Sequence, residues 1–492
     1  MGPTLPAWLA DRLRNGLGGV CLFGTNVVSS GQLRALTESI IACNPDAVIA
    51  IDEEGGDVTR LFYDAGSPYP GNAVLGRIDR PDLTESVGRD VGHALRDSGC
   101  TLDFAPDVDI NSNSDNPVIG VRSFGADAEL VATHTAAWIR GLQSTGIAAS
   151  AKHFPGHGDT ATDSHLALPT VDRSLEELRV RELAPFRAAI AAGSKSIMTS
   201  HILLPQLDRH NPATLSRRIL EGLLREELGF TGVIVSDALD MKGASGETGI
   251  PEAAVRALAA GCDLLCIGTG NTDEQLAEIE DAILDAVRHG RLAAERLEEA
   301  ARRVVALARE TVAETARAAG AQSVVSDHAA AVAPELVIQA FDVQPSAAVA
   351  FGEARDVQLI RIDAAANFAI GEAPWGVWAA LATDPDAEWA RLLTRNPVST
   401  VSRETDEPHE PREPHEPREL AEPGSLAIVI GRDNHLHPHA RAAIDRLRET
   451  RRVVVVDMGW PSDDRAYADV ATFGASRLTG EALGLALARW IS

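Results

Sequence analysis

Short apolar runs alternate with amphipathic segments through the first 320 residues of the chain. Each apolar run is as long as a buried strand, and the segments between the runs carry apolar residues at helical spacing. The predicted strands are 18–23, 47–51, 101–104, 147–151, 196–199, 232–236 and 264–267. The predicted helices include 31–43, 127–144, 174–192, 216–228 and 272–289. This alternation predicts a parallel sheet with covering helices.

Seven predicted strands approach the eight of a TIM-type (β/α)8 barrel. Segments rich in His and Asp follow the carboxyl ends of these strands, where barrel enzymes build their active sites. Before Gly18 the sequence offers only a proline-containing start and a short helix, so we expect the first barrel strand to be irregular or absent. A long Ala/Glu/Arg helix at about 293–320 ends this domain, which we assign to residues 1–320.

Residues 321–492 are predicted to form a second, smaller domain. Further strands at 357–362, 426–430 and 452–457 alternate with helices near 387–395, 437–449 and 478–490, a pattern typical of a three-layer α/β sandwich. The motif EPHEPR at 407–412 is repeated at 413–418. Frequent proline excludes a helix or a central strand, so residues 404–422 are predicted to be a solvated surface insert.

Charge and composition exclude several classes of partner. The chain has 71 acidic and 45 basic residues, a formal net charge of −26, which disfavours binding to nucleic acid or to an anionic membrane surface. No stretch of about 18 apolar residues and no basic leader followed by an apolar run occurs. Together with five scattered cysteines, this predicts a cytoplasmic protein. Gly268-Thr269-Gly270 lacks the third glycine of a dinucleotide fingerprint, and we expect no cofactor.

The densest group of polar residues follows the fourth predicted strand. The segment 152–165, KHFPGHGDTATDSH, holds three histidines, two aspartates and a lysine among two glycines and a proline. Such a composition does not pack as a helix. It predicts a long catalytic loop at the mouth of the barrel.

Other strand ends carry polar residues as well. Asp237 follows the apolar run at 232–236, and its carboxylate either points into the barrel mouth or caps the next helix. DEEGGDVTR at 52–60, Asp107 to Asn111 and His201 follow three further strands. Each alone could be a loop that solvates its charges. Together they indicate one site at the carboxyl edge of the sheet.

The stretches DEEGGDVTR, GVRSFG, KHFPGHGDTATDSH and SDALDM, in this order, resemble family 3 glycoside hydrolases. The most similar branch is the β-N-acetylglucosaminidases that act on N-acetylglucosaminides and muropeptide fragments. The resemblance covers residues 15–310. Over the last 160 residues it is weaker and extends to two-domain members with a C-terminal α/β sandwich.

The resemblance implies a role for each matching residue. Asp237 would be the nucleophile, and His165 the acid/base, oriented by Asp163. The residues implied to contact the sugar are Asp52, Arg60, Arg122, Lys152, His153 and His201. An imidazole with a pKa near 6.5 suits both halves of a retaining cycle, and a carboxylate two residues earlier can fix its tautomer.

These features predict an exo-acting, retaining β-N-acetylglucosaminidase with a small-molecule glycoside as substrate. Aromatic residues are only 4% of the chain, which favours a pocket for one terminal sugar over a long polysaccharide cleft. Phosphorolysis and a β-glucosidase or β-xylosidase of the same family remain alternatives, as do a monomer and a homodimer.

A more distant alternative is a metal-dependent hydrolase. Its zinc ligands would come from His153, His157, His165, His201 and Asp237. Lys152 would then place a cation beside the metal, so no metal is expected.

Overall fold

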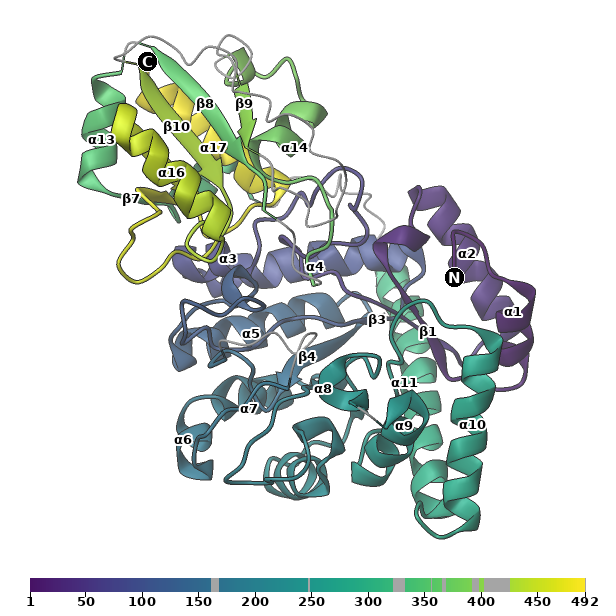
Figure 1. The fold of residues 1–492 in the computed structure, drawn as a ribbon. Coiled ribbons are helices and arrows are strands. Elements are labelled where there is room, and N and C mark those ends of the chain that lie inside the picture. The colour runs from purple at the N-terminus through teal and green to yellow at the C-terminus, as the bar shows by residue number, and fades with distance from the viewer. Residues whose placement is uncertain are drawn as a thin grey trace, which may run out of the picture.

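The computed structural model describes residues 1–160, 168–246, 248–321, 332–354, 356–364, 369–391, 398–401 and 425–491. They form two sheets, each with its own helices (Figure 1). We refer to residues 1–321 as the first domain and to the described residues from 332 onward as the second.

The first sheet is parallel throughout, and its strands are hydrogen-bonded in chain order. The strands are β1 (Gly19–Leu22), β2 (Val48–Ile51), β3 (Leu102–Asp103), β4 (Ala148–Phe154), β5 (Ser196–Thr199) and β6 (Val233–Val235). A curled parallel sheet with sequential strand order confirms the predicted barrel-like fold. No strand precedes β1 in residues 1–18, which are all described.

The predicted strand at 264–267 is wrong. Leu264 makes a single parallel bridge with Val235 and the ladder stops there. The backbone groups of Cys266, which would continue the ladder, are hydrogen-bonded to the turn after β6. The Cys266 N–H donates to the Ser236 hydroxyl at 3.0 Å, and the Cys266 carbonyl accepts from the Leu239 N–H at 2.9 Å. Tertiary hydrogen bonds therefore replace the strand pairing that the apolar run predicts.

Helices surround the first sheet. They are α1 (Ala7–Arg14), η1 (Gly24–Asn26), α2 (Ser30–Cys43), α3 (Asn72–Ile78), α4 (Pro81–Ser98), η2 (Gly120–Arg122), α5 (Ala128–Gln143), α6 (Leu175–Val180), α7 (Leu183–Ala191), η3 (Ala213–Leu215), η4 (Arg218–Glu227), α8 (Lys242–Ser245), α9 (Gly249–Ala260), α10 (Asp273–Arg288) and α11 (Ala294–Ala321). The predicted single helix 174–192 is divided into α6 and α7. Arg181 lies between them, and its side chain reaches Asp159 at 2.7 Å.

Alternation along the strands creates two apolar layers. Val48 and Ala50 belong to an inner cluster, whereas Ile49 and Ile51 pack outward against the helices. Val304 of α11 joins the inner cluster together with its neighbours Leu307 and Ala308. The long helix predicted at 293–320 thus closes the amino-terminal end of the barrel and leaves the carboxyl end for chemistry.

The second domain has three layers. Its strands are β7 (Asp342–Val343), β8 (Val357–Ile362), β9 (Val398–Val401), β10 (Leu426–Gly431), β11 (Val453–Asp457) and β12 (Val470–Ala471), in the order β7-β12-β11-β10-β8-β9 with only β7 antiparallel. Its helices are α12 (Pro334–Ile338), α13 (Pro345–Gly352), α14 (Gly376–Thr383), α16 (Pro438–Thr450) and α17 (Arg477–Trp490).

In this domain α16 covers one face of the sheet, and α13, α14 and α17 cover the other. The predicted sandwich is therefore confirmed. The insert at 404–422 and part of the helix predicted near 387–395 lie outside the described residues.

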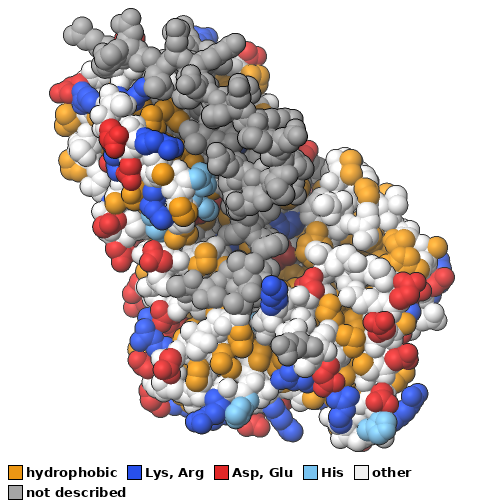
Figure 2. Space-filling model, viewed as in Figure 1, with side chains coloured by type: hydrophobic (Ala, Val, Ile, Leu, Met, Phe, Trp, Pro, Cys, Tyr) orange, Lys and Arg blue, Asp and Glu red, His pale blue; other side chains and the backbone are white. Residues whose placement is uncertain are grey.

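The surface carries charges of both signs, with Lys, Arg, Asp and Glu side chains interspersed over the face in Figure 2. Among the helices of the described residues, none is long and apolar enough to cross a membrane.

Candidate active site

A small pocket lies at the carboxyl ends of the first sheet's strands. Its lining includes Asp52, Glu54, Arg60, Arg122, Lys152, His153, His157 and Asp237. These residues come from the ends of β2, β4 and β6 and from η2. The cavity encloses about 120 Å³. A cavity of this size disfavours a long polysaccharide and favours the end of a short glycoside.

Asp237 lies two residues beyond β6. Its backbone N–H donates to the Thr199 hydroxyl at 3.4 Å, and one carboxylate oxygen accepts from the Ala238 N–H at 2.7 Å. Helix α8 begins at Lys242, with Met241 in the capping position. Asp237 therefore does not cap that helix, and it lines the pocket instead.

A buried chain of charges forms one wall of the pocket. The Lys152 ammonium contacts Asp52 and Glu54, each at 2.7 Å, and the Arg122 guanidinium binds both carboxylate oxygens of Glu54 at 2.7 and 3.0 Å. Burial alone would raise the pKa of Glu54, but Arg122 and Lys152 outweigh it and hold that pKa well below its usual range. Asp52 and Glu54 likewise keep Lys152 protonated, since they outweigh the burial that lowers its pKa. Glu54 is a residue of the site that was not predicted from the sequence, although it stands two residues from Asp52.

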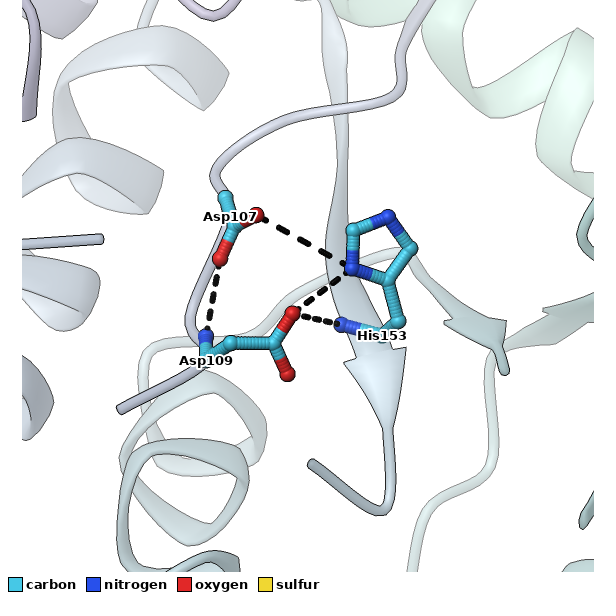
Figure 3. Close-up of side chains that lie close together, drawn as sticks. All are labelled: Asp107, Asp109 and His153. Carbon is cyan, nitrogen blue, oxygen red and sulfur yellow. Dashed lines mark hydrogen bonds and ion pairs between the residues drawn. The ribbon is translucent and has the colours of Figure 1, made fainter. Parts of the chain in front are cut away.

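His153 enters the pocket in a fixed orientation. Its Nδ1 lies 2.7 Å from Asp109 Oδ2 and 3.9 Å from Asp107, while its Nε2 points away from both acids (Figure 3). Burial, and next the charge of Arg122, lower the pKa of His153 to about 4. The neutral ring therefore donates Nδ1–H to Asp109 and leaves the Nε2 lone pair as an acceptor. Arg122 Nη2 lies 3.4 Å from that nitrogen.

The donor set does not fit a metal ion. Ligand atoms of Asp107, Asp109 and His153 lie within 4.8 Å of one another. However, Arg122 Nη2 lies only 3.5 Å from Asp107 Oδ2, so a guanidinium already provides positive charge to this group. His201, named for the zinc alternative, is turned to other partners.

Both ring nitrogens of His201 lie 2.9 Å from an oxygen, Nδ1 from the Thr214 hydroxyl and Nε2 from the Ala238 carbonyl. His201 is fully buried and is not among the residues that line the pocket. The structure therefore does not bring it together with the other predicted sugar contacts. It braces the residue next to Asp237. His165 and Asp163 lie outside the described residues, and the acid/base assignment stays a prediction.

His157 lines the pocket and was missed as a substrate contact in the sequence analysis. Its backbone N–H donates to Asp109 at 2.6 Å, and its Nδ1 lies 3.1 Å from the Thr160 hydroxyl. Its buried Nε2 has no hydrogen-bond partner among the described residues. The motif KHFPGHG pointed to the loop, but which of its histidines reach the pocket depends on the path of the loop.

We expect His157 to make the protein less stable in acid. Burial lowers the pKa of His157 to about 4. Between about pH 6.5 and about pH 4 the imidazole is therefore protonated in the unfolded chain and neutral in the folded protein. Stability therefore falls as the pH falls through this window, by up to about 3 kcal/mol from this group. Urea unfolding at about pH 7 and about pH 4.5 should show a smaller acid loss for His157→Gln than for the unchanged protein. His210→Gln, at an exposed position, is the control. Equal acid losses in all three proteins would contradict the assignment.

Arg60 is held from two sides. Its backbone N–H and that of Leu61 each donate to Glu53 at 2.9 Å, and the Thr59 hydroxyl donates to the same carboxylate at 2.8 Å. Burial raises the pKa of Glu53 to about 7. The Arg60 guanidinium donates to carbonyl oxygens of Ala369 and Ile370 in the second domain, at 2.5 and 3.2 Å.

Known proteins share sequence with the first domain of this chain. Residues 6–307 match the profile of the glycosyl hydrolase family 3 N-terminal domain. The chain belongs to glycosyl hydrolase family 3. It is 38% identical over 274 residues to a beta-hexosaminidase of Stenotrophomonas maltophilia, covering 54% of this chain and 81% of that protein. It is 36% identical over 310 residues to beta-hexosaminidase A of Pseudoalteromonas piscicida. This match covers 57% of this chain and 52% of that protein, so the chain spans about half the length of that relative.

Among solved structures, one family 3 enzyme is similar to this chain over both domains. A β-N-acetylglucosaminidase from Paenibacillus superposes with a TM-score of 0.83 at 30% identity, covering 100% of this chain and 94% of that one. NagZ from Neisseria gonorrhoeae, in complex with N-trifluoroacetyl-D-glucosamine, has a TM-score of 0.52 at 34% identity, covering 66% of this chain and 96% of that one. The two-domain family 3 architecture is therefore shared over the whole chain.

Proposed function

We propose that this protein is an exo-acting, retaining β-N-acetylglucosaminidase that removes terminal N-acetylglucosamine from small glycosides. The observation that carries the proposal is the carboxylate of Asp237 in a small pocket shared with Lys152, His153 and Arg122. The full-length similarity to a β-N-acetylglucosaminidase supports the choice of sugar.

The pocket offers directed contacts around a sugar ring. Lys152 and Arg122 donate to hydroxyl oxygens, and Asp52 accepts from a hydroxyl. Because Lys152 and Arg122 are each bound to carboxylates, their positions are fixed before substrate arrives. Such preorganisation reduces the entropy that is lost when the substrate binds.

The chemistry takes two displacements. A carboxylate oxygen of Asp237 attacks the anomeric carbon, the glycosidic bond breaks, and His165 gives a proton to the leaving oxygen. The neutral imidazole of His165 then takes a proton from water as water attacks the anomeric carbon and releases Asp237. Asp163 stabilises the imidazolium form that donates the proton in the first step and forms again in the second. Configuration at the anomeric carbon is retained.

We place the natural substrates among muropeptide-like fragments, and the site of action in the cytoplasm. All five cysteines are free thiols in the structure, which supports a reducing compartment. The small cavity supports action on a terminal residue of a short glycoside.

The test compares an aryl β-N-acetylglucosaminide with an aryl β-glucoside that has the same leaving group, each with and without inorganic phosphate. A site that hydrogen-bonds the N-acetyl group rejects the analogue without it, so we expect kcat/KM to favour the N-acetyl substrate by at least about 100-fold. A ratio near one would move the protein to the β-glucosidase alternative. Faster turnover with phosphate, together with a sugar phosphate as product, would identify a phosphorylase.

A further inference from the structure

The second domain reaches the pocket through a short segment between β8 and α14. This segment, residues 369–372, places Ala369 in the pocket lining and the carbonyl oxygens of Ala369 and Ile370 against Arg60. We propose that the 369–372 segment, through the Ala369 and Ile370 carbonyls, holds the Arg60 guanidinium toward the sugar. The identity of that sugar rests on the proposed function.

The chemistry of the two arginines in the pocket explains why a carbonyl clamp matters. Arg122 is neutralised by the carboxylate of Glu54, which binds it through both oxygens. Among the described residues, the guanidinium of Arg60 donates to two backbone carbonyls, which carry no net charge and take two of its five donors. The other donors can bind a sugar oxygen, and the direction of the guanidinium depends on the second domain.

The segment is tied to the same barrel loop that carries Arg60. The Glu372 N–H donates to the Tyr63 hydroxyl at 3.0 Å. Gly371 packs against the Tyr63 ring with a φ of +72°, and a Cβ added there would lie 3.0 Å from the hydroxyl. Nearby, Asp57 accepts from the Ala475 N–H of the second domain at 2.7 Å. Loop and segment thus form one unit, so moving the segment moves the carbonyls that orient Arg60.

The proposal makes the 369–372 segment a positioning element. It carries no group that reacts, and losing its alignment should weaken sugar binding more than the chemical steps. We therefore expect a rise in KM with a smaller change in kcat. A displacement of about 1 Å in a positioning group can cost about 100-fold in rate.

The test is a double-mutant cycle in the full-length protein. Gly371→Ala adds a Cβ against Tyr63 in a left-handed backbone conformation. Its matched control is Gly290→Ala, because Gly290 has a φ of +70° and nothing within 4 Å of the added Cβ. We expect Gly371→Ala to lower kcat/KM about tenfold or more, mainly through KM, and Gly290→Ala to leave it unchanged. In an Arg60→Ala background Gly371→Ala should have no further effect. Equal effects of Gly371→Ala with and without Arg60 would overturn the proposal.

A second variant and a second readout keep the result independent of folding and of the substrate. Tyr63→Phe removes the acceptor for Glu372 with minimal change of shape, and it replaces Gly371→Ala in the cycle if that variant does not fold. Labelling of Arg60 by phenylglyoxal, followed by mass spectrometry of its peptide, should be slow in the unchanged protein and faster in both variants. Unchanged labelling in both variants would overturn the proposal that the 369–372 segment positions Arg60. If only an aryl β-glucoside is turned over, the proposed function fails. The same double-mutant cycle measured on that substrate still tests whether the 369–372 segment positions Arg60.

Discussion

Replacing Asp237 with alanine should lower turnover of aryl β-N-acetylglucosaminide by at least about 10⁴-fold and leave the fold intact. The carboxylate lines the pocket, and its bond to the Ala238 N–H serves only the local turn. Loss of such a group from the rim of a barrel removes the covalent step and little packing. The measurement is kcat/KM for the aryl substrate, with the thermal midpoint as the check on folding.

The control is Asp240→Ala, three residues along the same loop. Asp240 is exposed, accepts from the Thr269 N–H at 3.1 Å, and is not among the residues that line the pocket. It should keep near-normal turnover. A fluorinated glycosyl donor should label Asp237 in the unchanged protein, because slow breakdown traps the glycosyl-enzyme. Near-normal activity of folded Asp237→Ala, or a label on another carboxylate, would disprove the nucleophile assignment.

The barrel could be predicted because its strands are buried on both faces. Runs such as 47–51 are apolar at every position, since alternate residues pack against the inner cluster and against the helices. The run at 264–267 has the same composition and is not a strand. The difference comes from hydrogen bonds between Cys266 and two residues that are distant in the sequence, Ser236 and Leu239. The apolar pattern of a short run does not indicate which distant residues will hydrogen-bond to it.

The site could be predicted only in part, for a related reason. The strand-end rule and the motifs led to five predicted residues that share one pocket with Arg60: Asp52, Arg122, Lys152, His153 and Asp237. The roles within the motif DEEGG did not follow from its letters. Asp52 binds Lys152 at the pocket, Glu53 turns away to hold the Arg60 loop, and Glu54 joins Arg122 to Lys152. Three consecutive acids thus take three roles that depend on the cations and N–H groups they meet.

The contribution of the second domain had no signal in the sequence at all. Ala369 and Ile370 act through backbone carbonyls, which every residue possesses. Only the path of the chain between β8 and α14 brings those oxygens to Arg60. The same holds for Tyr63, whose hydroxyl accepts from a backbone N–H more than 300 residues away.

Replacing His165 with alanine should separate substrates by their leaving groups. General acid assistance matters most when the departing oxygen is basic, so an alkyl or sugar aglycone should lose up to about 10⁴-fold in kcat. An activated aryl oxygen leaves without a proton, and its glycosyl-enzyme should still form in a rapid burst. Deglycosylation, which needs the same imidazole as a base, then becomes rate-limiting for the aryl substrate.

Three measurements test this assignment: burst size and rate with the aryl glycoside, steady-state kcat with an N-acetylglucosamine disaccharide, and both again for Asp163→Asn. The asparagine amide can still hydrogen-bond the ring, but it stabilises the imidazolium poorly, so this variant should show the same pattern to a smaller degree. His210→Ala, at an exposed position of the barrel, serves as the control and should behave as the unchanged protein. Equal losses on both substrates without a burst would refute His165 as the acid/base. The search would then turn to His157, a pocket histidine whose Nε2 has no hydrogen-bond partner among the described residues.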